Sequence, residues 1–62
     1  MAYTVMKKLI TNENTKFNNN MITADDYNLW KVGTLNKLDV FLACNRLSDA
    51  QYEELVSSIL DI

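Results

Sequence analysis

The sequence has no histidine and no proline, and only one cysteine and one glycine in 62 residues. The single cysteine, Cys44, excludes a disulfide within the chain, and the lack of histidine excludes a histidine-based catalytic triad or general base. One cysteine with scattered carboxylates is not a zinc-binding set. The scarcity of helix-breaking residues favours helices over a fold with many tight turns.

Long apolar runs and strong charge are also missing. No apolar run approaches the ~20 residues that span a bilayer, and the N-terminus lacks the pattern of a signal peptide, so we expect a cytoplasmic protein without membrane contact. The net charge of −2 is weak but unevenly distributed. Residues 1–22 carry three lysines and one glutamate, whereas residues 48–62 carry four acids and no base. The two ends are therefore electrostatically complementary.

What the chain does contain is enough apolar material to fold. The hydrophobic fraction of 48% is ordinary for a globular protein. A domain of this length buries only about 60% of the surface that its unfolded chain exposes, so it is marginally stable without further support. Because disulfides and a metal are excluded, tight packing and oligomerisation remain as sources of that support. We expect one small domain over residues 1–62.

Two short segments, "MITADDY" and "RLSDAQY", repeat one pattern. Each has an apolar residue, a Thr or Ser, a side-chain acceptor three residues later and a tyrosine four residues later. This pattern is typical of a helix N-terminus with a capping box and a hydrophobic staple. The residues in these roles are Ile22, Thr23, Asp26 and Tyr27 in the first segment, and Leu47, Ser48, Gln51 and Tyr52 in the second.

The predicted fold is therefore all-α, with three helices over about residues 3–11, 23–45 and 48–60. An asparagine-rich connector over residues 12–21 would join the first two helices, and a β-hairpin through the N-terminal segment is the alternative. Asn45 is the candidate left-handed residue that ends the long central helix.

The central helix is apolar on two faces. One wide stripe fits the core of the domain, and further apolar residues gather toward the opposite side, namely Leu29, Val32, Val40, Ala43 and Cys44. Since the other helices of so short a chain cover only one face, the second predicts a homodimer or larger homo-oligomer. The candidate interface residues are Leu29, Trp30, Val32, Val40 and Cys44. Trp30 is also a candidate for the core, and Gly33 would kink the helix or allow close backbone approach.

Nothing in the sequence indicates catalysis. The adjacent carboxylates Asp25 and Asp26 point to different sides of a helix, which fits capping and solvation better than paired acid–base chemistry. Cys44 lies in an apolar segment and is interpreted as a buried structural thiol. We therefore predict no catalytic, cofactor-binding or metal-binding residue, no enzymatic activity and no small-molecule substrate.

Two helices joined by "NRLS" also raise the helix-turn-helix interpretation. The helix that begins at Ser48 would then be the recognition helix, but the segment from Ser48 onward carries four acids and no base, which opposes contact with phosphates. The sequence therefore predicts no nucleic-acid partner.

Part of the chain resembles short proteins of phages of Gram-positive bacteria, which are often encoded near tail or lysis genes. The shared elements are Lys8-Leu9-Ile10, the "KLDVF" segment from Lys37 to Phe41, Asn45 to Leu47, Ser48, and Gln51 to Leu55. They cover about half of the chain, and residues 12–20 look like an insertion. The resemblance implies no enzymatic activity.

Together with small size and surplus apolar surface, the resemblance leads to the expectation of a phage protein that acts by protein–protein interaction. The favoured hypothesis is binding and inhibition or modulation of a host protein, such as an antiviral defence component. A virion or tail-assembly accessory protein is the alternative, and a DNA-binding regulator is a weaker one.

Overall fold

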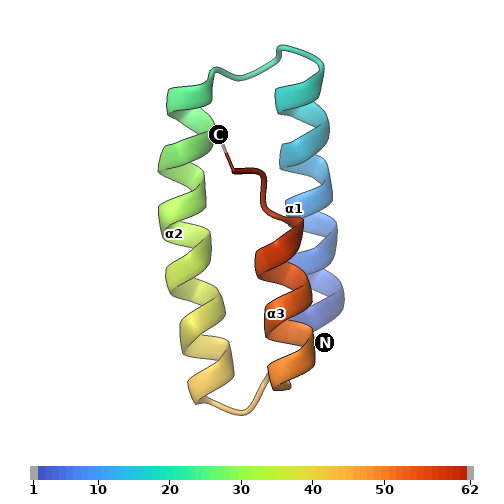
Figure 1. Cartoon of the computed structure of the whole chain (residues 1–62), viewed down its shortest axis with the longest axis vertical. Helices are drawn as coiled ribbons and strands as arrows, with labels where there is room; N and C mark the ends of the chain where they lie inside the picture. The colour runs from blue at the N-terminus through green and yellow to red at the C-terminus, as the bar shows by residue number, and fades with distance from the viewer. Residues whose placement is uncertain (1, 62) are drawn as a thin grey trace.

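Three helices run alternately up, down and up in the computed structural model, which describes residues 2–61 (Figure 1). They are α1 (Ala2–Asn18), α2 (Ala24–Ala43) and α3 (Asp49–Ser58). The part of the chain that the structure describes contains no strand. The predicted small three-helix all-α domain is confirmed, and the β-hairpin alternative is wrong.

Helix α1 is longer than the 3–11 predicted, because most of the expected connector is helical. Asparagine is a weak helix former, and the sequence prediction gave this local preference too much weight. Tertiary contacts override it here: the Asn14 side-chain amide donates to the Ser58 carbonyl across 2.8 Å. Within α1, Lys16 forms an ion pair with Glu13 at 3.1 Å. The actual connector between α1 and α2 is only the five residues 19–23.

The two turns between helices have the same backbone design. Asn20 and Asn45 both adopt the left-handed conformation, with φ of 59°. In each turn the amide of the next residue returns to the carbonyl five residues back, across 2.8 Å. This is the Schellman arrangement, in which a left-handed residue lets the last carbonyls of a helix find donors. The role predicted for Asn45 is confirmed, and Asn20, 25 residues earlier, repeats it.

Both predicted helix starts are confirmed. The Thr23 hydroxyl accepts from the Asp26 amide across 3.1 Å, and the Ser48 hydroxyl accepts from the Gln51 amide across 3.1 Å. The Gln51 side chain also accepts from the Ser48 amide, which completes a capping box. At the first cap, which lies wholly within the described residues, the Asp26 side chain does not accept from the Thr23 amide. The side chain of aspartate is one methylene shorter than that of glutamine and does not reach back to the cap.

The core lies where all three helices meet. Its most buried side chains contribute most of the hydrophobic stabilisation, at roughly 1.5–3 kcal/mol for each fully buried large side chain. They are Met6, Ile10, Leu38, Leu47 and Leu55. Helix α3 lies along α1 and α2 and supplies Leu55, which is fully buried (Figure 1).

A buried tyrosine organises the end of the molecule where α3 stops. Tyr27 is 0% exposed, and its hydroxyl donates to the Asn14 side-chain oxygen and accepts from the Leu60 amide at 3.0 Å. Asn14 also donates to the Ser58 carbonyl, and Ile59 is extended, so the chain leaves the helix after Ser58. Leu60 then contacts α2 through Tyr27 and through the Lys31 side chain, which donates to its carbonyl. Helix α3 therefore ends at Ser58, two residues before its predicted end.

The second tyrosine of the repeated pattern makes the equivalent contact. The Tyr52 hydroxyl donates to Asp39 across 2.6 Å, and this hydrogen bond raises the pKa of Tyr52. In both hairpins the tyrosine in the first turn of a helix reaches a polar side chain 13 residues earlier, on the preceding helix. The repeated sequence pattern thus encodes two helical hairpins built on one plan.

Candidate protein-interaction surface

Helix α2 has one face in the core and another that nothing covers. Tyr27, Thr34 and Leu38 are its buried residues and lie on the inner face. On the other side three large apolar side chains are exposed: Leu29 by 76%, and two valines by 61% and 58%. Isolated exposed apolar residues are normal at a protein surface, whereas a row of them along one helix face is a candidate interaction surface.

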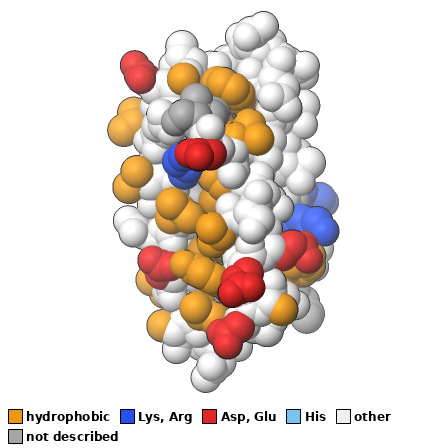
Figure 2. All heavy atoms as spheres, viewed as in Figure 1, with side chains coloured by type: hydrophobic (Ala, Val, Ile, Leu, Met, Phe, Trp, Pro, Cys, Tyr) orange, Lys and Arg blue, Asp and Glu red, His pale blue; other side chains and the backbone are white. Residues whose placement is uncertain are grey.

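The exposed row has a regular spacing. We call it the outer stripe, and it consists of Leu29, Val32, Asn36, Val40 and Ala43. Its successive steps of three, four, four and three residues keep all five positions within about 80° of one another around a helix of 3.6 residues per turn. Figure 2 shows hydrophobic side chains along the side of the molecule that α2 forms, at the left of the view.

Most of the predicted interface residues lie on this exposed side. Leu29, Val32 and Val40 belong to the outer stripe and are exposed. Trp30 does not, because it is partly buried, packs against the core and places its ring 5.2 Å from that of Tyr27.

Cys44 differs from its prediction in two ways. Helix α2 ends at Ala43, before Cys44 and before the predicted end at residue 45. The cysteine itself is exposed, so its interpretation as a buried thiol is wrong. The reason is its position: Cys44 follows the exposed Val40 by four residues, and its amide still donates to the Val40 carbonyl across 2.9 Å, so its side chain lies on the uncovered side of α2.

Sequence reasoning missed one member of the outer stripe, Asn36, although it placed Ala43 on this side of the helix. Asn36 and Ala43 are exposed and lie in line with the three large side chains. The spacing of Asn36 was visible in the sequence, but a polar side chain does not add to an apolar pattern. Gly33 lies beside the stripe, the helix runs through it without a break, and a Cβ built there has no neighbour within 4 Å.

A second surface feature lies where α1 meets α3. Lys7 forms an ion pair with Glu54 at 3.2 Å, and the Tyr3 hydroxyl donates to the same carboxylate. The hydrogen bond from Tyr3, and then that from Lys7, lowers the pKa of Glu54, while the hydrogen bonds that Lys7 donates to Tyr3 and then to Glu54 raise the pKa of Lys7. This cluster joins the basic N-terminal part of the chain to its acidic C-terminal part.

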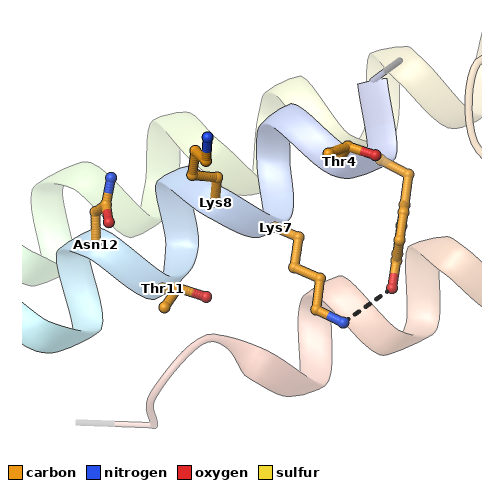
Figure 3. A pocket seen from close by; sticks show the side chains of 6 residues that line it. Thr4, Lys7, Lys8, Thr11 and Asn12 are labelled. Atoms are coloured by element: carbon orange, nitrogen blue, oxygen red, sulfur yellow. Dashed lines mark hydrogen bonds between the residues drawn. The ribbon is translucent and has the colours of Figure 1, made fainter.

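The neighbouring hollow on α1 is shallow and open, with a volume of about 280 Å³. Figure 3 shows that Lys7 extends toward α3, whereas Lys8 and Asn12 point to another side of α1. One of the two lysines that line the hollow, Lys7, is thus already paired with Glu54, and this contact joins α1 to α3.

Among residues 2–61, no group of three or more potential ligand side chains is placed to hold a metal ion. Within the same range, no helix is both long enough and apolar enough to cross a membrane. Comparison with known protein families, curated proteins and solved structures finds no match for this chain. The resemblance to short phage proteins therefore stays a prediction.

Proposed function

We propose that this is a non-enzymatic protein that acts by protein–protein contact and uses the outer stripe of α2 as its contact surface. The observation that carries the proposal is the row of Leu29, Val32 and Val40, each more than half exposed on one face of a helix. Burying such side chains against a partner removes apolar surface from water, at about 25 cal/mol per Å².

The proposed uses of this surface are self-association and, in competition with it, binding of a bacterial host protein. Self-association follows from the size of the chain, since a small domain with a free apolar helix face gains stability by covering it. The host target follows from the resemblance to phage proteins and from the small size of the chain. In this proposal the protein binds to a surface of its target in the cytoplasm of an infected cell, and thereby inhibits or modulates that target.

The host-binding proposal is tested by affinity capture from a Gram-positive bacterium during phage infection. The wild-type protein is compared with Leu29→Glu, which places a charge on the outer stripe, and with Ser57→Glu, an exposed α3 position outside it. We expect an identified bacterial protein to be retained by the wild type and Ser57→Glu and lost with Leu29→Glu. Equal retention by all three proteins, or none by any, would contradict the proposal.

The same lysate separates host binding from a structural role in the phage particle. Mass spectrometry of purified particles is the measurement, because an accessory protein of the virion or tail is present there in stoichiometric amount. Such presence would favour the particle role over host modulation.

A further inference from the structure

We propose that the outer stripe pairs with the outer stripe of a second copy of this chain, with the two α2 helices antiparallel and the two-fold axis at Asn36. The inference rests on the proposed function, because it names the partner of the same surface. It is carried by the spacing of the stripe, the sizes of its side chains and the charges at the two ends of α2.

The spacing of the stripe is symmetric about its middle. Val32 and Val40 lie four residues before and after Asn36, and Leu29 and Ala43 lie seven residues before and after it. In an antiparallel pair with its two-fold axis at this asparagine, Val32 faces the partner's Val40, and Leu29 faces the partner's Ala43. A two-fold interface requires this kind of self-complementary surface.

The side-chain sizes agree with that register. The largest member of the stripe, Leu29, meets the smallest, Ala43, while the two valines meet each other. Alternation of large and small side chains across facing positions fills an interface evenly. Gly33, at the edge of the stripe, adds no Cβ that would hold the two backbones apart.

Asn36 fits the central position. Its side-chain amide has both donors and an acceptor, so two copies that meet at the axis can hydrogen-bond to each other. A single polar asparagine in an otherwise apolar helix seam fixes the register of the pair at some cost in stability.

The charges select the antiparallel orientation. Asp25 and Asp26 lie in the first turn of α2, and Arg46 follows its last turn. An antiparallel pair brings the acidic turn of one copy toward the arginine of the other and opposes the two helix dipoles favourably. A parallel pair would instead place the acidic turns of both copies side by side, which is unfavourable.

The native cysteine distinguishes the two orientations. In the antiparallel pair the partner's Cys44 lies about 24 Å away along the helix direction, from the 1.5 Å rise per residue. A disulfide needs Cα atoms roughly 4.4–6.8 Å apart, so the native thiols cannot join. In a parallel pair in register they would lie together.

The experiment is oxidative cross-linking of three full-length proteins under mild oxidant. They are the wild type with Cys44 only, N36C/C44S with its thiol at the axis, and S57C/C44S with an exposed thiol on α3 as the collision control. We expect N36C/C44S to form a covalent dimer at least about tenfold faster than the other two, since only its thiols are within disulfide range in the pair.

Two outcomes would overturn the inference. Rapid dimerisation of the wild type through Cys44 would show a parallel pair, and equal rates for N36C/C44S and S57C/C44S would show that the outer stripe does not pair. If the second outcome occurs while Leu29→Glu still abolishes capture of a bacterial protein, the pairing fails but the proposed function stands. If N36C/C44S cross-links no faster than the control and Leu29→Glu does not reduce capture, both the pairing and the proposed function are wrong.

Discussion

Replacing Tyr27 with phenylalanine tests how much of the fold depends on the hydrogen bonds at the end of α3. The substitution keeps the buried ring, which packs against Phe17 and Trp30 at centroid distances of 5.5 and 5.2 Å. It removes only the hydroxyl, which donates to Asn14 and accepts from the Leu60 amide. No cavity larger than one oxygen atom is created, so lost packing contributes little.

The expected cost follows from the number of bonds lost. Two hydrogen bonds at a net value of roughly 0.5–1.5 kcal/mol each give a destabilisation of about 1–3 kcal/mol. A chain of this length has a free energy of unfolding of roughly 3–9 kcal/mol, at 0.05–0.15 kcal/mol per residue. The substitution therefore removes a substantial share of the stability, and a loss near 2 kcal/mol lowers Tm by about 8–16 °C.

The assay is urea unfolding followed by circular dichroism, with thermal unfolding as a second probe. Tyr52→Phe is the matched control, because Tyr52 has the same position in the second hairpin but makes one exposed bond, to Asp39. We expect that control to change the free energy of unfolding by less than about 0.5 kcal/mol. If Tyr27→Phe costs no more than Tyr52→Phe, the assigned role of the buried hydroxyl is wrong.

Three further predictions concern single positions. Ser48→Ala removes the acceptor of the complete cap and should cost about 1 kcal/mol in urea unfolding; an unchanged midpoint would refute the role of the cap. Gly33→Ala, made in the monomeric Val40→Glu background, should stabilise by roughly 0.5–1 kcal/mol, since the site is helical and open within one copy; a lower Tm would reveal a clash. Glu54→Gln tests the lowered pKa of the Glu54 carboxyl. Because the folded protein favours the charged carboxylate, this group stabilises the fold at pH values above its ordinary pKa, and the stabilisation is lost as the pH falls through the lowered pKa. The stability difference from wild type should thus be present at pH 7 and vanish in acid, and a difference independent of pH would contradict the ion pair.

The sequence revealed the helix starts because their causes are local. Thr23 and Ser48 accept hydrogen bonds from residues three positions later, so a short window contains the whole interaction. The left-handed role of Asn45 is local for the same reason. In both segments an asparagine, Asn20 or Asn45, stands seven residues before the tyrosine, and this spacing is visible in the sequence. That both asparagines end the preceding helix in the left-handed conformation is seen only in the structure.

The ends of α1 and α3 were not predictable in the same way. The helical state of the asparagine-rich segment depends on Asn14, whose partner Ser58 lies 44 residues away in sequence. The early end of α3 depends on the same contact and on Tyr27. The outer stripe was partly predictable, because apolar spacing indicated Leu29, Val32 and Val40, while the inward position of Trp30 follows from ring packing that spacing does not show.

The most direct test of the central claim is the molar mass of charge variants at tens of micromolar, measured by light scattering. The wild type should have twice the 7.1 kDa chain mass. Val40→Glu should be a folded monomer, because an unpaired charge cannot be buried in the pair. The combination V32K/V40E should restore the dimer, since it places opposite charges face to face only when the helices are antiparallel. A wild-type monomer, or a double variant that stays monomeric like Val40→Glu, would contradict the antiparallel pairing of the outer stripe.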